Sequence, residues 1–164
     1  MDFSDRKHVI ILACSGTCES GWTTIGCFCY KFQATGKTWD DAKTDCAALK
    51  STGKLVSITS ESLELALITM ANKKEFWTGG NDKAVQETFV WDADGTEFFK
   101  GGNGIGYNKW WATTAVSQPN HGNGQDCVKL KVKLSSTTGD LEKYGWDDVS
   151  CTNSPIPYIC QYNL

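Results

Sequence analysis

Cysteine is the residue type in this sequence with the most chemical options, because a thiol can form a disulfide, bind a metal or act as a nucleophile. The chain has 164 residues, and eight of them are cysteines. The spacings of Cys14 to Cys18 and of Cys27 to Cys29 are CxxxC and CxC, and no second CxxC or histidine pair completes a zinc site. We therefore expect disulfides, which persist in oxidising compartments, and predict a secreted, extracellular protein.

Side chains that could catalyse a reaction are sparse. His8 and His121 are the two imidazoles of the sequence, and neither an HExxH nor a Gly-x-Ser-x-Gly motif is present. No pair of acids has a spacing that suggests general acid–base work. We predict that the protein is not an enzyme.

Charge and apolar runs exclude two further classes. The chain carries 16 Lys and Arg against 19 Asp and Glu, for a formal charge of -3, and we expect no nucleic-acid partner. The apolar run at residues 9–13 is far shorter than the roughly 18 residues that span a bilayer, so we expect no membrane insertion. The acidic first residues do not resemble a secretory signal, and we interpret Met1 as an added start or an edited mature terminus.

Apolar spacing predicts two helices in the first half of the chain. Thr38, with Asp41 three residues later, resembles a capping box and marks the start of the first helix. Its expected buried stripe is Trp39, Ala42, Cys46 and Leu49. The second helix is predicted to begin after Ser60. Its expected apolar face is Leu63, Leu67 and Met70.

Short apolar or alternating runs, separated by turn residues, predict strands. The expected strands span residues 54–58, 76–80, 88–91, 128–134 and 144–146. In the run 128–134, aliphatic residues alternate with Lys129, Lys131 and Lys133, which we expect to form a solvated face. Residues 100–126 are rich in glycine and predict a long irregular loop of the kind that is often functional. No repeat or linker divides the chain, which indicates one domain.

Several ordered motifs resemble the long form of the C-type lectin-like domain. They are Cys18-Glu19-Ser20-Gly21-Trp22, Cys29-Tyr30-Lys31-Phe32, Thr38-Trp39-Asp40-Asp41-Ala42, Leu55-Val56-Ser57-Ile58, Trp77-Thr78-Gly79-Gly80, Gln118-Pro119-Asn120, Asp126-Cys127-Val128, Trp146-Asp147-Asp148-Val149-Ser150-Cys151 and Tyr158-Ile159-Cys160. The resemblance implies an α+β fold with two helices, two small antiparallel sheets and a long irregular binding loop, stapled by disulfides. We expect residues 1–17 to be an N-terminal extension and residues 18–164 to be the carbohydrate-recognition domain.

The same resemblance implies three disulfides. They are Cys18–Cys29, Cys46–Cys160 and Cys127–Cys151. Cys14 and Cys27 fall outside this pattern, and they either pair with each other or bridge two chains. The second alternative predicts a disulfide-linked homodimer.

The resemblance also implies a calcium ion at the tip of the long loop, where it coordinates two adjacent sugar hydroxyls in the family. The matching positions are Gln118, Asn120, Gln125, Asp147 and Asp148, and all five side chains carry oxygen. The family pattern implies a cis peptide bond before Pro119. Because Gln125 and Asp147 stand where the family usually has Glu and Asn, two carboxylates remain, and we predict one weak calcium site.

The class of sugar follows less directly from the resemblance. Gln118-Pro119-Asn120 is a hybrid of the family's mannose-type Glu-Pro-Asn and galactose-type Gln-Pro-Asp. Gln118 favours galactose or N-acetylgalactosamine, and so do Trp110, Trp111 and His121, which could contact a sugar face. At least one of the two tryptophans is equally a candidate for the core. Two alternatives stay open, namely sugar binding without calcium and a protein-interaction module on the same fold.

Overall fold

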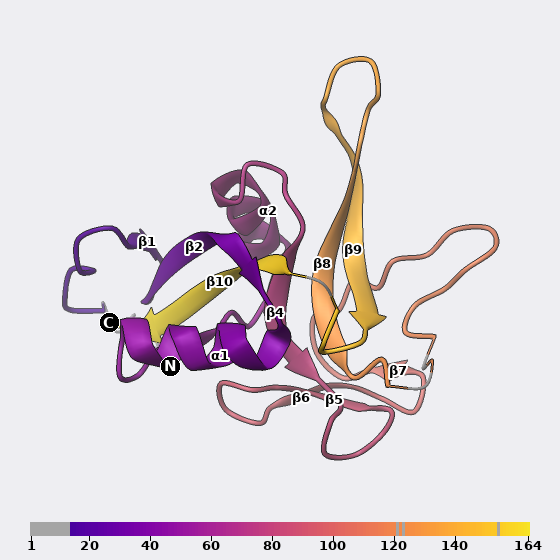
Figure 1. Cartoon of the computed structure of the whole chain (residues 1–164), viewed down its shortest axis with the longest axis horizontal. Helices are drawn as coiled ribbons and strands as arrows, with labels where there is room; N and C mark the ends of the chain where they lie inside the picture. The colour runs from indigo at the N-terminus through magenta and orange to yellow at the C-terminus, as the bar shows by residue number, and fades with distance from the viewer. Residues whose placement is uncertain (1–13, 121, 123, 154) are drawn as a thin grey trace, which may run out of the picture.

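The computed structural model describes residues 14–120, 122, 124–153 and 155–164, and Figure 1 shows their arrangement. Their helices and strands are β1 (Thr23–Ile25), β2 (Phe28–Lys37), α1 (Trp39–Leu49), β3 (Lys54–Leu55), α2 (Glu61–Met70), β4 (Phe76–Asn81), β5 (Thr88–Trp91), β6 (Glu97–Lys100), β7 (Asn103–Gly104), β8 (Cys127–Leu134), β9 (Leu141–Val149) and β10 (Ile156–Asn163). None of the helices among these residues is long and apolar enough to cross a membrane.

Both predicted helices form, and each begins where its capping residue indicates. Thr38 Oγ1 accepts a hydrogen bond from the backbone N–H of Asp41 at 3.3 Å, and Ser60 Oγ accepts one from Leu63 at 3.3 Å. These acceptors satisfy backbone donors that the start of a helix leaves unpaired. α1 buries Trp39, Ala42 and Cys46. Leu49 is instead 37% exposed, so its expected burial is wrong, because the helix ends there and Lys50 is already extended.

The second helix packs with a slightly different face from the one expected. α2 buries Glu64, Leu67 and Ile68. Leu63 and Met70, which the apolar spacing selected, are half-buried. Residues separated by three and four positions share one face of a helix, so the buried face of α2 carries a carboxylate at its first position. Glu64 is fully buried there.

Hydrogen bonds join the strands into one branched sheet, where two separate sheets were expected. β1, β2, β3 and β10 form one antiparallel group, and β4 to β9 form another. A single parallel pair, Tyr158 on β10 with Trp77 on β4, connects the two groups. Both predicted groups are therefore present, and a pair of buried aromatic residues makes them one body.

The expected strand at residues 54–58 is shorter than predicted. β3 contains Lys54–Leu55 alone, paired with β10. The next residue, Val56, donates its N–H to the carbonyl of Ile159 on β10 at 3.0 Å and accepts from the N–H of Gly79 on β4 at 2.8 Å. Val56 thus lies between the two strand groups and hydrogen-bonds to each, which adds a second connection beside the Tyr158–Trp77 pair.

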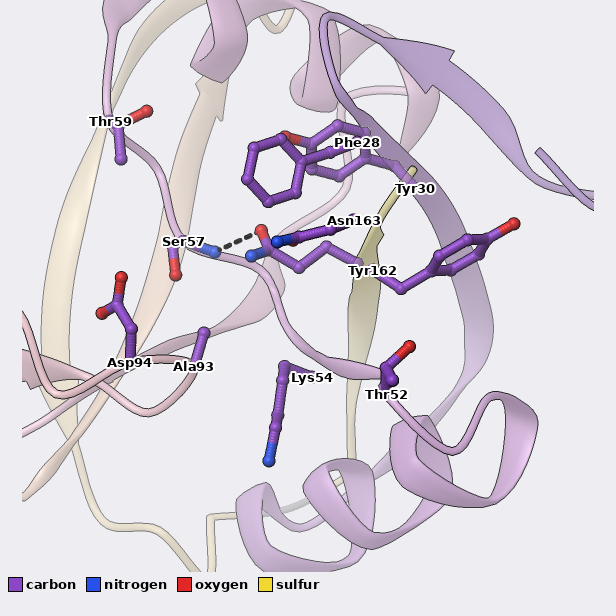
Figure 2. A pocket seen from close by; sticks show the side chains of 11 residues that line it. Phe28, Tyr30, Thr52, Lys54, Ser57, Thr59, Ala93, Asp94, Tyr162 and Asn163 are labelled. Atoms are coloured by element: carbon purple, nitrogen blue, oxygen red, sulfur yellow. Dashed lines mark hydrogen bonds between the residues drawn. The ribbon is translucent and has the colours of Figure 1, made fainter. Parts of the chain in front are cut away.

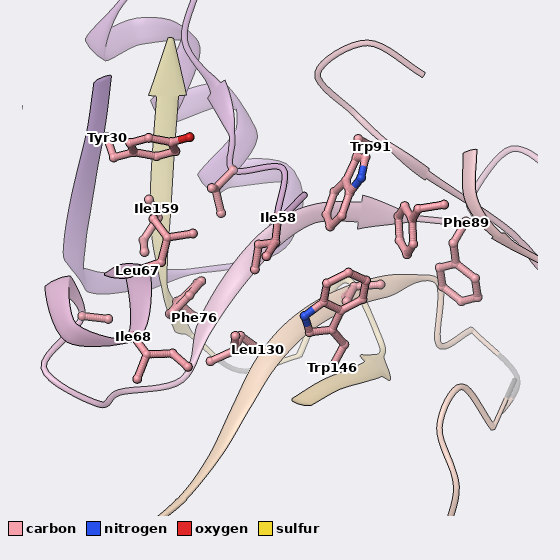
Figure 3. Packing of buried hydrophobic residues seen from close by; sticks show 14 of the residues in the cluster. Tyr30, Ile58, Leu67, Ile68, Phe76, Phe89, Trp91, Leu130, Trp146 and Ile159 are labelled. Carbon is pink, nitrogen blue, oxygen red and sulfur yellow. The ribbon is translucent and has the colours of Figure 1, made fainter. Parts of the chain in front are cut away.

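The larger buried cluster gathers aromatic side chains between the strand groups and α2, as Figure 3 shows. Trp91 stacks on Phe98 with ring centroids 4.2 Å apart and meets the ring of Trp146 edge-on at 5.4 Å. Such pairs add a geometric preference to the burial of large apolar surfaces. Because Trp146 belongs to β9, this packing fixes the strand that also carries Asp147 and Asp148.

All eight cysteines are paired within the chain. The three disulfides implied by the resemblance form, and Cys14 bonds to Cys27. Of the two alternatives for Cys14 and Cys27, the structure has the bond between them. The Cα atoms of Cys14 and Cys27 are 5.4 Å apart, since the turn between β1 and β2 brings Cys27 back toward the segment before β1.

The Cys46–Cys160 bond closes a loop of 114 positions, and the Cys14–Cys27 bond closes one of 13. The chain-entropy relation gives about 4 to 5 kcal/mol for the longer loop and about 3 kcal/mol for the shorter one. We expect the double variant Cys46→Ala/Cys160→Ala to lose more unfolding free energy than Cys14→Ala/Cys27→Ala, measured by urea denaturation. Equal losses in the two variants would contradict this ranking.

Candidate functional site

The long loop is held against β9 by its own backbone. Trp146 donates its N–H to the carbonyl of Lys109 at 2.7 Å, and its carbonyl accepts from the N–H of Trp111 at 2.8 Å. The loop therefore forms a short parallel bridge at Trp110, beside the strand that carries the two candidate acids. Among the described residues of the segment 100–126, the other regular pairing is that of β7 and an isolated bridge between Ala112 and Ser117. This part of the segment is therefore a largely irregular loop, as expected.

The Gln118–Pro119 peptide bond is cis, as the family pattern implies. After this bond, the backbone N–H of Asn120 donates to Oδ1 of Asp148 at 3.1 Å. The Asp148 side chain is fully buried, so the contact ties the loop to the base of β9 away from bulk water. This bond brings residues 118–120 next to Asp148, which is far from them along the chain.

Gln118 presents an oxygen that lacks a partner among the described residues. Its Oε1 atom is buried and accepts no hydrogen bond from them, while its backbone N–H donates to the carbonyl of Trp111 at 2.8 Å. A buried acceptor without a donor costs free energy, so this oxygen is suited to a cation or a ligand hydroxyl. Of the five candidate ligands, Gln118 shows the clearest unmet bonding capacity.

Gln125 and Asp147, like Asp148, already have partners within the protein. Gln125 Oε1 accepts the backbone N–H of Gly122 at 2.9 Å, which closes a short turn within the loop. Asp147 Oδ2 lies 3.2 Å from the ammonium of Lys131 on β8. The described residues contain no cluster of three or more His, Cys, Asp or Glu side chains. With few carboxylates available, the oxygen-bearing side chains at these positions fit a weakly held hard cation better than a tightly bound one.

The tandem tryptophans both pack against other side chains of the fold. Trp110 packs edge-on against Phe89 and Phe99, with ring centroids at 4.9 and 5.3 Å. Trp111 is 8% exposed, and the ammonium groups of Lys131 and Lys143 lie 5.2 and 4.6 Å from its ring centroid. The core interpretation is therefore confirmed for Trp111, whereas Trp110 is half-buried and packs against the larger buried cluster. His121 lies outside the described residues.

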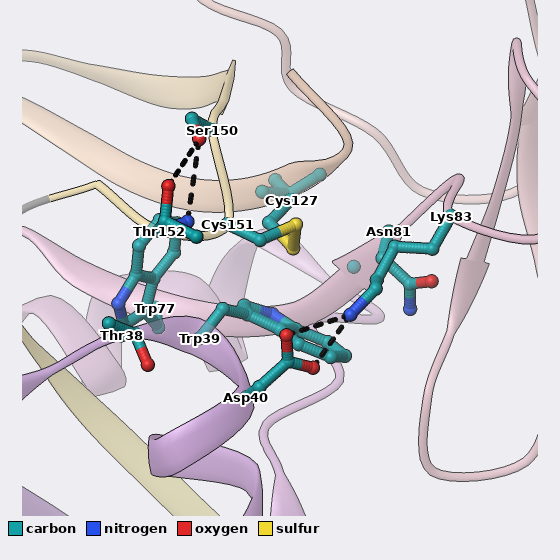
Figure 4. Close-up of a disulfide and its surroundings, with 12 residues drawn as sticks. Thr38, Trp39, Asp40, Trp77, Asn81, Lys83, Cys127, Ser150, Cys151 and Thr152 are labelled. Atoms are coloured by element: carbon teal, nitrogen blue, oxygen red, sulfur yellow. Dashed lines mark hydrogen bonds and ion pairs between the residues drawn. A yellow bond between two sulfur atoms is a disulfide. The ribbon is translucent and has the colours of Figure 1, made fainter. Parts of the chain in front are cut away.

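The Cys127–Cys151 disulfide closes the base of the hairpin that carries the site, as Figure 4 shows. Cys127 begins β8, and Cys151 follows β9. The carbonyl of Cys151 accepts the N–H of Trp39 at 3.0 Å, and the indole of Trp39 donates to the carbonyl of Thr78 at 2.8 Å. The hairpin is thereby fixed to the start of α1 and to β4.

Glu64 is a residue at the base of this loop that sequence reasoning missed. Its two carboxylate oxygens accept hydrogen bonds at 2.5 Å, one from the hydroxyl of Tyr107 in the loop and one from the indole of Trp146 on β9. Burial raises the pKa of the Glu64 carboxyl, and the two hydrogen bonds oppose that rise. The signal in the sequence was an acid three residues before Leu67, on the apolar face of the predicted helix.

An exposed counterpart lies one turn before Glu64. The carboxylate of Glu61 accepts from Lys109 at 2.8 Å and from the hydroxyl of Tyr144 at 2.9 Å. The hydrogen bond from Lys109, followed by that from Tyr144, lowers the pKa of Glu61. α2 therefore contacts both the long loop and β9 through two acids, one buried and one at the surface.

A hollow of about 370 Å³ lies elsewhere on the molecule, between β2, β3, β10 and the turn after β5 (Figure 2). Phe28 and Tyr30 line it from β2, and Asp94 lines it from the turn. The N–H of Ser57 donates to the side chain of Gln161 at 2.9 Å within it. No candidate ligand from the long loop or β9 lines this hollow, so it is separate from the site described above.

Comparison with known proteins identifies similar sequences and folds. The family described as "Lectin C-type domain" matches residues 35–162. An alpha-N-acetylgalactosamine-specific lectin of Patiria pectinifera is 28% identical over 148 residues, which are 85% of this chain and 77% of that protein.

Two solved structures are similar over almost the whole chain. The cow C-type carbohydrate-recognition domain of CD23, solved in the presence of a GlcNAc2Man3 oligosaccharide, has a TM-score of 0.68 and 26% identity, covering 92% of this chain and 98% of that one. A calcium-independent type II antifreeze protein has a TM-score of 0.67 and 28% identity, covering 90% of this chain and 95% of that one. Similar folds thus occur in proteins with different ligands.

The buried carboxyl of Glu64 predicts a specific dependence of stability on pH. Because its folded pKa is raised above the ordinary value of 4.5, the folded protein retains a proton that the unfolded chain has released. The raised pKa adds to the free energy of unfolding at pH values below 4.5, and this gain is lost as the pH rises through the folded pKa. We expect the stability difference between wild type and Glu64→Gln to shift against the wild type as the pH rises, measured by urea denaturation across a pH series.

Glu61 is the matched control for this experiment. Its pKa is lowered, so its contribution is present above the ordinary value and is lost as the pH falls through the folded pKa. Glu61→Gln should therefore produce a difference of opposite sign, and a small one, because the side chain is 60% exposed and screened by solvent. The same pH trend in both variants would contradict the assignment to Glu64.

Proposed function

The chain belongs to the C-type lectin domain family, and on that premise we propose that it binds carbohydrate with the long loop, in the region of the cis proline and the end of β9. Residues 18–164 form the carbohydrate-recognition domain in this proposal. The observation that carries it is the bond from the backbone of Asn120 to Asp148, which holds the segment with the cis proline against an acid of β9. The chemistry proposed is binding, without catalysis.

The five candidate ligands have unequal parts in this proposal. Gln118, Asn120 and Asp148 would hold a calcium ion, whose coordination shell would be completed by two sugar hydroxyls. Asp147 and Gln125 are second contributors, because the ion pair with Lys131 and the turn at Gly122 would have to open before these side chains could reach the ion. Gln118 carries the strongest support, since its buried Oε1 lacks a donor among the described residues.

We propose that galactose or N-acetylgalactosamine glycans are the ligand class. The support is the glutamine at position 118 together with the similarity to a lectin named for N-acetylgalactosamine. The tryptophans do not support this proposal, because the ring of Trp111 is buried beside two lysines and that of Trp110 packs against the core. In this proposal, polar contacts with the sugar contribute more to the binding free energy than aromatic stacking does.

Sugar binding without calcium is the second candidate function, and one observation favours it. The ammonium of Lys131 lies beside Asp147 and supplies a positive charge where the family pattern would use a metal ion. One of the similar solved structures is described as calcium-independent. Glycan-array binding measured with and without a chelator separates the two candidates, since loss with chelator supports the first and persistence supports the second.

A site of this kind is shallow, and two hydroxyls correspond to an affinity near the millimolar level, about -4 kcal/mol. Several linked sites would raise the avidity by roughly 10² to 10⁴. Because every cysteine is paired within the chain, any homodimer would be noncovalent. The four disulfides support our proposal that the protein is secreted.

We expect Asp148→Asn to reduce glycan binding at least about tenfold, because the amide removes a carboxylate that both orders the loop and faces the ligand. Isothermal titration calorimetry with N-acetylgalactosamine in calcium measures the effect. Asp140→Asn is the matched control, since Asp140 is an exposed acid at the far end of the same hairpin. Unchanged binding in Asp148→Asn, with glycan binding by the wild type, would count against this site.

A further inference from the structure

We propose that Lys131 is a built-in counter-cation of the glycan site and that it sets how tightly this site holds calcium. The inference rests on the function proposed above, and it concerns a residue outside the five ligand positions. Lys131 lies in the middle of β8, where its side chain was expected to be part of a solvated face. The structure places its ammonium 3.2 Å from Oδ2 of Asp147 on the neighbouring strand.

The alternating lysines of β8 have different surroundings. Lys129 pairs with Glu75 at 2.7 Å, and Lys133 pairs with Glu142 at 2.8 Å. Both of these acids lie outside the proposed site. The partner of Lys131, in contrast, is a candidate calcium ligand. The three lysines have similar neighbours in the sequence, but Lys131 alone among them pairs with an acid of the proposed site.

Two contacts fix the position of the Lys131 ammonium. One is the ion pair with Asp147. The other is the ring of Trp111, whose centroid lies 5.2 Å from the nitrogen. A cation over an aromatic face is attracted by the ring quadrupole. The Asp147 side chain is 9% exposed, against 34% for Lys131, so the acid is the more buried partner and depends on the ammonium for compensation.

The charge at the site follows from these contacts. Asp147 and Asp148 supply two negative charges, and the remaining ligand positions are neutral amides. Lys131 cancels one of the two charges at hydrogen-bonding distance. Calcium affinity depends strongly on the number of ligand charges, and an ammonium near the ion adds repulsion. For calcium to use Asp147, the lysine must release it.

This arrangement gives Lys131 a defined consequence for ligand recognition. With the lysine in place, its positive charge balances the Asp147 carboxylate in the absence of a metal ion. Calcium is therefore not needed to compensate this acid. Removing the positive charge exposes a buried carboxylate whose best available partner is the metal. Lys131 therefore acts as a competitor for calcium from within the chain, and its loss should increase calcium affinity.

The test is a calcium titration of ¹⁵N-labelled protein, followed by the amide resonances of Asn120 and Asp148, with calcium chloride alone as the ligand. We expect Lys131→Met to bind calcium about tenfold more tightly than wild type, because one positive charge is removed near the ligands. Methionine keeps much of the aliphatic contact with Trp111. Lys131→Arg retains the charge and should match the wild type.

Lys133→Met is the matched control, because it removes the same charge two residues farther along β8, beside an acid outside the site. Its calcium affinity should stay within about twofold of the wild type, since surface charges act weakly at that distance. Thermal unfolding with and without calcium gives a second readout, in which calcium should raise the midpoint of Lys131→Met more than that of the other proteins.

Equal calcium affinity in Lys131→Met and wild type, including no detectable binding in either, would overturn the inference. An equal increase in Lys131→Met and Lys133→Met would also overturn it, since net charge alone would then be responsible. Glycan binding by the wild type, measured separately, tests the proposed function. A chain that binds no glycan but shows the expected ranking of calcium affinities would contradict the function and leave the role of Lys131 supported.

Discussion

The buried carboxylate of Glu64 joins three parts of the molecule that are distant in the sequence. It lies on α2, it accepts a hydrogen bond from Tyr107 in the long loop, and it accepts another from Trp146 on β9. The backbone of Trp146 in turn holds the loop at Lys109 and Trp111. A largely irregular loop cannot hold its shape through its own ladder bonds, so its position depends on these contacts to a rigid helix and strand.

The chemistry of the candidate site follows from how strand register distributes charge. β8 and β9 pair in register over most of their length, which sets Asp147 opposite Lys129 and next to Lys131. The same register turns Asp148 toward the loop, where it accepts from the backbone of Asn120. Adjacent acids in the sequence therefore have different partners. One acid organises the loop, and the other is compensated by a lysine.

Local signals predicted much of the fold, whereas partners across the chain were harder to predict. The caps at Thr38 and Ser60 involve backbone groups within three residues, so the sequence pattern is sufficient. The disulfides and the cis proline followed from ordered motifs of a known family. The burial of Glu64 and the ion pair of Lys131 depend on strand register and helix rotation, which are decided by packing of the whole core. A periodic pattern alone assigned Lys131 to solvent.

The two ends of the described chain meet on one side of the molecule. The N–H of Leu164 donates to the carbonyl of Cys27 at 3.0 Å, and Cys27 is bonded to Cys14. In Figure 1 the C-terminus lies beside β1, α1 and β10, while the long loop projects from the opposite end. An anchor attached at Leu164, whether a surface, a resin or a neighbouring domain, would leave the loop facing outward. The fold thus has an inherent orientation, with Cys14, Cys27 and Leu164 at one end and the long loop at the other.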